Sequence, residues 1–128
     1  MNWLDILGWK EGEIDALRAA GFSYVKQGAY DLALTFFEAL VVLSPGNAYD
    51  SQTLGALYLQ TGNGLRALDA LDNALKMEPT HLETRLNRAK TLCMLGYKRQ
   101  GLTMAAELEK SENSQIASQA TALIMAYK

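Results

Sequence analysis

The sequence predicts an all-α solenoid, in which short antiparallel helices stack as helix-turn-helix repeats. Two observations support this prediction: prolines and glycines both recur along the chain, and they do so at the same interval. The two prolines, Pro45 and Pro79, stand 34 residues apart. The glycines Gly28, Gly62 and Gly96 follow one another at that same interval. A fixed period of this length is typical of repeat architectures, in which each repeat packs only against its neighbours.

The residues within each period follow the pattern of the tetratricopeptide repeat (TPR), W-x2-L-G-x2-Y…A-x3-F…P. Two repeats keep this pattern and a third is degenerate. The matching residues of the first repeat are Gly21, Tyr24, Ala33, Phe37 and Pro45, and those of the second are Gly55, Tyr58, Ala67, Leu71 and Pro79. In the third, Ala89 replaces the glycine and Asn113 stands where the proline would fall.

These matches place the repeats at about 14–47, 48–81 and 82–113, within a single TPR domain that spans residues 1–128. Each repeat is expected to hold two helices. The first helices end at glycines, which adopt a left-handed C-cap at little cost, and the second helices end at prolines. The expected helices span about 14–27, 30–43, 48–61, 64–77, 82–95 and 98–110.

Both ends of the stack need a covering segment, because terminal repeats otherwise expose their packing faces. After Asn113, apolar residues at helical spacing predict a capping helix over about 115–127; they are Ile116, Ala120, Leu123, Ile124 and Tyr127. At the other end, residues 3–7 predict a short N-terminal helical turn. Trp3 and Trp9 either cover this end of the stack or form a dimer contact.

Composition excludes several classes of protein. A formal charge of −2 is too small to favour nucleic acid or an anionic membrane as a partner. No stretch approaches the ~20 apolar residues of a membrane span, so stable membrane insertion is not expected. The N-terminus has no basic leader and no small-residue cleavage site, and Cys93 is the only cysteine. We therefore expect a cytoplasmic protein without a signal peptide or internal disulfide.

The sequence offers no convincing catalytic group. His81, the only histidine, is expected to be a solvated turn residue, and Cys93 a small packed residue rather than a nucleophile. There is no P-loop, dinucleotide-binding glycine motif or pair of zinc ligands. We therefore expect no enzymatic activity, no cofactor and no metal.

The expected function is protein binding in the concave surface that first helices line in such stacks. The inward-facing positions form one row per repeat. The rows are Asp15, Arg18, Phe22, Val25 and Lys26; then Tyr49, Gln52, Ala56, Leu59 and Gln60; then Glu83, Leu86, Lys90, Cys93 and Met94.

The middles of these rows are apolar, which suits apolar client side chains, while Arg18, Lys26 and Lys90 would steer polar ends. Phe22 and Ala56 occupy the positions where carboxylate-clamp TPR proteins carry asparagine, so a carboxylate clamp is not expected. A basic cluster in the third repeat includes Arg88, at a position that is usually apolar. Either this repeat is loosely packed, or this face meets a partner.

Residues 22–62 resemble the TPR-type chaperones of bacterial type III secretion systems. The resemblance rests on the hairpin corner Gly28–Tyr30, the F-x-A-L-x-x-L run at Phe37–Leu43, and the Y-D-S start of a helix at Tyr49–Ser51. It implies a cytosolic chaperone that holds an export substrate in its concave groove. The groove residues that it implies are Phe22, Tyr30, Leu59 and Leu86.

Several alternatives stay open from the sequence. The implied client is a translocator, a needle subunit or an early export substrate, and a second small chaperone or a homodimer partner is compatible with the resemblance. The main alternative function is a general TPR scaffold or adaptor in a multiprotein complex.

Overall fold

The computed structural model describes residues 11–128, and these form seven helices. The helices are α2 (Glu11–Lys26), α3 (Tyr30–Leu43), α4 (Ala48–Gln60), α5 (Gly64–Met77), α6 (Leu82–Met94), α7 (Lys98–Leu108) and α8 (Ser114–Tyr127). Each begins and ends within three residues of its expected place. The expected N-terminal turn, with Trp3 and Trp9, lies outside the described residues.

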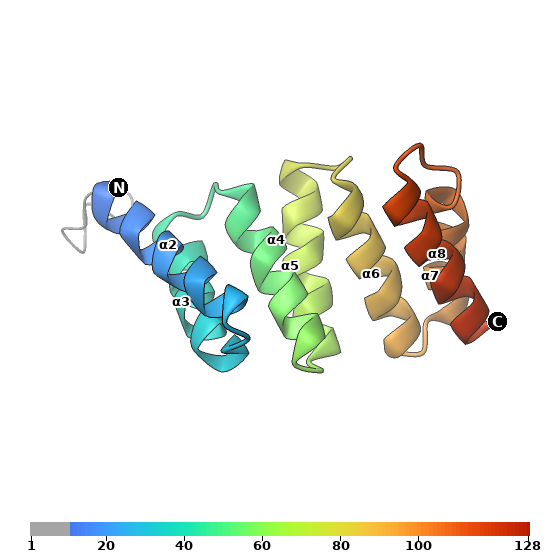
Figure 1. The fold of residues 1–128 in the computed structure, drawn as a ribbon, viewed down its shortest axis with the longest axis horizontal. Helices are drawn as coiled ribbons and strands as arrows, with labels where there is room; N and C mark the ends of the chain where they lie inside the picture. The colour runs from blue at the N-terminus through green and yellow to red at the C-terminus, as the bar shows by residue number, and fades with distance from the viewer. Residues whose placement is uncertain (1–10) are drawn as a thin grey trace.

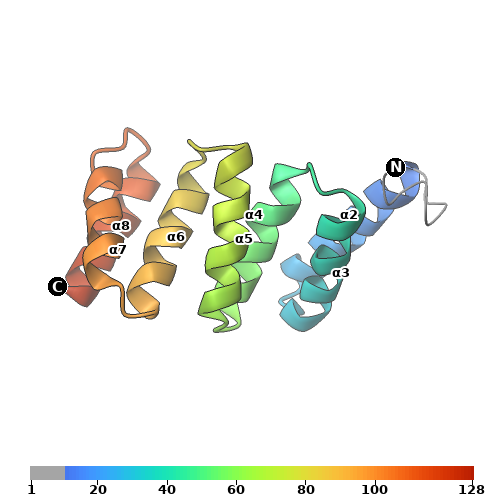
Figure 2. The same cartoon turned by 180° about the vertical axis from the view of Figure 1, so that it is seen from behind.

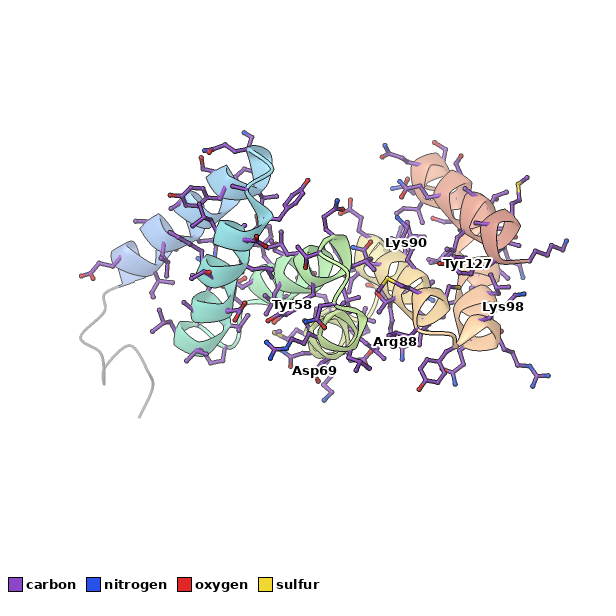
Figure 3. The ribbon with its side chains drawn as sticks, turned by 90° about the horizontal axis from the view of Figure 1, so that it is seen from below. Tyr58, Asp69, Arg88, Lys90, Lys98 and Tyr127 are labelled. Carbon is purple, nitrogen blue, oxygen red and sulfur yellow. The ribbon has the colours of Figure 1, made fainter. Side chains whose placement is uncertain are left out.

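The helices stack in two layers, which confirms the predicted all-α TPR solenoid. Helices α2, α4, α6 and α8 lie on one side of the stack (Figure 1), and α3, α5 and α7 lie on the other (Figure 2). Neighbours in sequence pack together, and α6 also contacts α4 and α8 within its own layer. Seen from below, α2 and α8 stand at the two ends of an arch, with α4 and α6 set back between them (Figure 3).

The three corners between paired helices share one geometry. Gly28, Gly62 and Gly96 have φ angles of 76°, 83° and 93°, a region that favours glycine. The next residue's N–H donates to a carbonyl five residues back, as Ala29 does to Tyr24 at 2.9 Å. This Schellman arrangement satisfies carbonyls that a helix end leaves unpaired and turns the chain back on itself.

Small residues set the distance between paired helices. A Cβ atom on Gly55 would lie 2.5 Å from Leu71 Cδ2, and one on Gly21 would lie 2.9 Å from the Phe37 ring. In the degenerate third repeat, the close approach is made by Gly101, whose Cβ would lie 2.5 Å from Cys93 Sγ. Gly21, Gly55 and Gly101 therefore allow the two helices of each repeat to approach closely.

Side-chain caps start four of the helices. Asn47, Asn63 and Asn113 accept backbone N–H groups of α4, α5 and α8. His81 does the same for α6: its Nδ1 accepts the Thr84 N–H at 3.3 Å and lies 2.7 Å from the Thr84 hydroxyl. His81 lies in the turn between α5 and α6, as expected, but its ring is half-buried and caps a helix, a role that was not predicted from the sequence.

Two apolar clusters form the core. One joins α2 to α5 around Phe37, Leu40 and Leu71, all of which are fully buried. The other joins α6, α7 and α8, where Ile116 and Ala120 pack with Leu108. The latter contacts confirm the predicted capping helix, because α8 covers the apolar face of the last repeat. No helix within residues 11–128 is long and apolar enough to cross a membrane.

Candidate functional site

The first two predicted rows converge on an open hollow of 340 Å³, which we call the first hollow. Phe22 and Val25 reach it from α2, and Tyr49, Gln52 and Ala56 reach it from α4. The α6 wall was only partly predicted. It consists of Glu83, Thr84 and Asn87, together with the capping residue His81. These residues meet because every second helix of the stack lies in the same layer.

A second hollow, of 420 Å³, opens between α4, α6 and α8. The predicted residues Leu59, Lys90 and Met94 line one side of it. The other side belongs to α8, and its residues are Gln119, Ala122, Leu123 and Tyr127. Sequence reasoning missed this wall because it treated α8 only as a cap. The i, i+4, i+8 spacing of Gln119, Leu123 and Tyr127 was the available signal for a second face.

Large apolar side chains are exposed along these hollows. Phe22 is 45% exposed, Tyr49 40% and Met94 40%. Side chains of this size lose a favourable burial term when they stay in water, and clustered exposed apolar groups are typical of interaction surfaces. The layer of α2, α4, α6 and α8 therefore offers apolar surface to a ligand.

Two residues predicted for the groove pack instead into the protein. Leu86 is 2% exposed and belongs to the core cluster of α6, α7 and α8. Tyr30 begins α3, in the other layer, and packs against the core of the first two repeats. Both are corrections, because a side chain that is already packed internally has little surface left for a client.

Arg18 also differs from its expected role as a steering cation. Its guanidinium donates to both carboxylate oxygens of Asp50, at 2.7 and 2.8 Å, and to Asp15 at 3.0 Å. The hydrogen bond to Asp50 is the main reason that the pKa of Arg18 is raised. Asp50 is fully buried, so Arg18 joins α2 to α4 rather than facing a client.

The basic residues of the third repeat do not form one patch. Arg88 Nε lies 2.5 Å from Asp72 Oδ1, and Arg85 Nη2 lies 3.1 Å from Glu107 Oε2. Figure 3 places Arg88 and Lys90 on different sides of the stack. The unusual Arg88 is therefore explained by an ion pair between α5 and α6. Lys90 instead lines the second hollow, where its Nζ donates to Gln119 Oε1 at 3.3 Å.

Cys93 packs against α7, and its side chain is buried in the core of the last repeat. Burial raises the pKa of its thiol, an effect that exceeds the opposing influence of the Lys98 charge. A thiol in this state is a weak nucleophile at neutral pH. Within residues 11–128, no three His, Cys, Asp or Glu side chains are grouped so that they could hold a metal ion.

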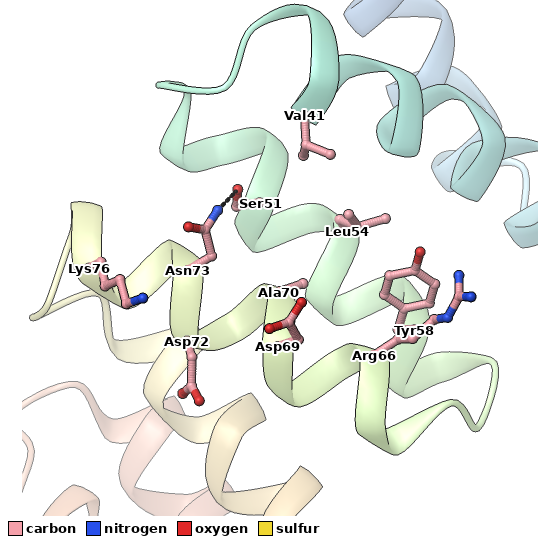
Figure 4. Close-up of a pocket in the computed structure, with 10 residues that line it drawn as sticks. All are labelled: Val41, Ser51, Leu54, Tyr58, Arg66, Asp69, Ala70, Asp72, Asn73 and Lys76. Carbon is pink, nitrogen blue, oxygen red and sulfur yellow. Dashed lines mark hydrogen bonds between the residues drawn. The ribbon is translucent and has the colours of Figure 1, made fainter.

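A third hollow, which the sequence did not predict, opens between α3, α4 and α5 (Figure 4). It measures 390 Å³; Leu54, Tyr58 and Ala70 supply apolar lining, and Arg66, Asp69 and Lys76 supply charges. Asn73 Nδ2 donates to Ser51 Oγ at 3.1 Å in its wall. This hollow mixes both signs of charge and lies apart from the two described above.

The fold and the exposed apolar layer define a TPR-type helical-repeat protein. The chain belongs to the family described as "Anaphase-promoting complex, cyclosome, subunit 3", which matches residues 26–108. No curated protein sequence matches it. Solved structures, by contrast, share its fold over nearly the whole chain.

Three of these structures contain bound peptides or client regions. The Yersinia enterocolitica type III secretion chaperone SycD, in complex with a peptide of the translocator YopD, has 20% identity and a TM-score of 0.80, covering 92% of this chain and 94% of that chain. Pseudomonas aeruginosa PcrH, with the chaperone-binding region of PopD, has 24% identity and a TM-score of 0.77, with 94% of each chain covered.

The third is the first TPR of Spaghetti (RPAP3) bound to the HSP90 peptide SRMEEVD. It has 17% identity and a TM-score of 0.78, covering 91% of this chain and 94% of that chain. At these identities the three structures establish the fold that the chain shares with them.

Proposed function

We propose that this protein binds a segment of a client protein across the first and second hollows, as a cytoplasmic chaperone of a type III secretion export substrate. The observation that carries the proposal is the pair of hollows on one layer, edged by exposed Phe22, Tyr49 and Met94. The action is binding and not catalysis: apolar side chains of the client would lie in the hollows and be kept from water.

The related structures support this proposal beyond the surface itself. SycD and PcrH share the fold over at least 92% of this chain. SycD is described with a peptide of the translocator YopD, and PcrH with the chaperone-binding region of PopD. Translocators, needle subunits and early export substrates are all candidates as the client. Each of these must stay soluble and unassembled before export, which is a task that shielding of apolar segments performs.

A general TPR scaffold or adaptor is the second candidate. The family match to a subunit of the anaphase-promoting complex, together with the RPAP3 structure, favours it. RPAP3 binds a peptide of HSP90, so proteins of this fold also bind partners other than translocators. The two candidates share the groove and differ in the fate of the partner.

The deciding experiment compares three forms of the tagged protein in its native cells. The groove variant is Phe22→Ala/Met94→Ala, which removes exposed apolar side chains from both hollows. The matched control is Val42→Ala/Leu65→Ala, which removes exposed apolar side chains from the opposite layer, where they are 47% and 72% exposed. Partners are recovered by affinity purification and quantified by mass spectrometry, and the secreted fraction of the same cultures is analysed in parallel.

The chaperone proposal expects a partner that the wild type and the control recover, that the groove variant loses, and that also occurs in the secreted fraction. Each fully desolvated anchor contributes about 1.5–3 kcal/mol, so the double variant should weaken binding by at least tenfold. Groove-dependent partners that are never secreted and occur at fixed stoichiometry would instead establish the adaptor.

A further inference from the structure

Two ionised side chains lie in the hollows, and both belong to α6. Glu83 lines the first hollow and Lys90 lines the second. Among residues 11–128, no other Asp, Glu, Lys or Arg lines either of them. The two residues are seven positions apart on one helix, which corresponds to about 10 Å of axial rise. One helix thus presents a negative charge to one hollow and a positive charge to the other.

Neither charge is neutralised by an ion pair within the described part of the chain. The acidic partners of Arg18, Arg85 and Arg88 are all other residues. Among residues 11–128, the hydrogen-bond partner of the Lys90 side chain is the neutral Gln119 Oε1, at 3.3 Å. Lys26 on α2 lies 5.2 Å from the centre of the Phe22 ring and does not line the first hollow. Glu83 and Lys90 are therefore available to a ligand.

The surroundings make these charges selective. Lys90 shares the second hollow with apolar Leu59, Met94, Ala122 and Leu123. Glu83 shares the first hollow with apolar Phe22, Val25 and Ala56. A ligand that covers these apolar groups excludes water, which lowers the local dielectric constant and strengthens charge interactions. An opposite charge then gains energy, whereas a like charge or an unpaired one is penalised.

We propose that Glu83 and Lys90 select and orient the client at the site of the proposed function. The preferred ligand is an apolar segment with a basic side chain against Glu83 and an acidic side chain against Lys90. An extended chain advances about 3.3 Å per residue, so the two charges in the client are about three to five positions apart. This inference rests on the proposed function, because it assumes that both hollows hold one segment.

The test is a selection of random short peptides displayed on phage, with the full chain as the bait. Three further baits are used in parallel. The swapped variant, Glu83→Lys/Lys90→Glu, reverses both charges. The control, Glu38→Lys/Arg99→Glu, reverses two exposed charges on α3 and α7 that make no ion pair with any of residues 11–128. The fourth bait is the groove variant Phe22→Ala/Met94→Ala. Circular dichroism and thermal unfolding verify that all four are folded.

We expect the wild type and the control to select apolar peptides that carry opposite charges in one order. The swapped variant should select the same apolar spacing with the order of charges inverted. Synthetic peptides from each selection are then measured by fluorescence anisotropy. Each should bind the bait that selected it at least tenfold more tightly than the bait with the opposite charge order.

Failure of this inference can be told apart from failure of the proposed function. The selected peptides could be apolar but carry no fixed order of charges, or the wild type and the swapped variant could select the same order. Either result would overturn the role of Glu83 and Lys90 and leave the groove intact. If the wild type selects no peptides, or only peptides that bind the groove variant equally well, both the proposed function and this inference are overturned.

Discussion

At the scale of single residues, the buried carboxylate of Asp50 connects two neighbouring repeats. It is fully buried, accepts two hydrogen bonds from Arg18, and its own backbone N–H donates to Asn47 at 3.0 Å. A buried carboxylate is tolerated only when it is paired and hydrogen-bonded. Arg18 therefore stabilises the first junction between repeats, although the sequence pattern had placed it in the groove.

Arg18→Met should lower the free energy of unfolding by about 3 kcal/mol, because it leaves Asp50 buried without its partner. Arg85→Met is the matched comparison, since the side chains of the Arg85–Glu107 pair are 30% and 61% exposed and ion pairs open to solvent contribute about 0–1 kcal/mol. Urea unfolding of both variants measures the difference. If the two variants lose the same unfolding free energy, the Arg18–Asp50 pair contributes no more to stability than the Arg85–Glu107 pair.

Cys93 provides a pH-dependent signature of its packing. Burial raises the pKa of the folded thiol above its ordinary value of 9.0, so the unfolded chain ionises first as the pH rises. The contribution of Cys93 to stability is therefore full below the ordinary thiol pKa and is lost as the pH rises through the folded value. The native thiol should also react slowly with iodoacetamide at pH 8, compared with the same protein in denaturant.

Cys93→Ala is the control for this pH effect, because it removes the titrating group. Its unfolding free energy should fall less steeply than that of the wild type above about pH 9. Rapid alkylation of the native wild type would contradict the burial of the thiol.

At the scale of helices, close packing within each pair depends on single glycines. Gly55→Ala places a methyl group where Leu71 Cδ2 lies 2.5 Å away and its backbone N lies 3.3 Å away. Overpacking of this kind costs about 1–3 kcal/mol. Alanine also favours the helix over glycine by about 1 kcal/mol. The measured loss of unfolding free energy is therefore the overpacking cost minus this gain.

Gly12→Ala separates these two effects. Gly12 also lies in a helix, but a Cβ atom there meets none of residues 11–128 within 4 Å. This variant should keep or raise the thermal midpoint, whereas Gly55→Ala should lower it. If both variants raise the midpoint, the α4–α5 pair has room that the structure does not show.

At the scale of the whole molecule, α8 serves both the fold and the second hollow. Its buried Ile116, Ala120 and Leu123 cover the last repeat, while Gln119, Ala122 and Tyr127 face the hollow. These two faces allow the roles to be separated. Ile116→Ala should lower stability by about 2–5 kcal/mol through loss of core contacts.

Tyr127→Ala, by contrast, should leave the unfolding free energy within about 0.5 kcal/mol, since Tyr127 is 37% exposed. It should nevertheless weaken any ligand of the second hollow. Calorimetric unfolding and anisotropy with a selected peptide measure the two effects on the same samples. If Tyr127→Ala changes stability as much as Ile116→Ala does, α8 would be a cap without a binding face.

The periodic residues were enough to predict the helices, their order and the corners between them. This succeeded because Gly28 and its equivalents, the prolines and the apolar spacing act locally, within one or two turns of helix. Where exposure follows from helix phase, as for Phe22, Tyr49 and Met94, the predicted groove residues are exposed in the structure, and their role in binding a client stays a prediction. The prediction for the site was poorer where a residue's surroundings come from another helix.

Only the tertiary structure decided those cases, because packing between distant segments is not written in any local pattern. Leu86 became a core residue because α8 folds back over α6. Arg18 and Arg88 form ion pairs between helices because Asp50 and Asp72 lie opposite them. These partners are 32 and 16 residues away in the sequence. Periodicity thus specifies which face of a helix points inward, whereas the partner that meets that face depends on the whole chain.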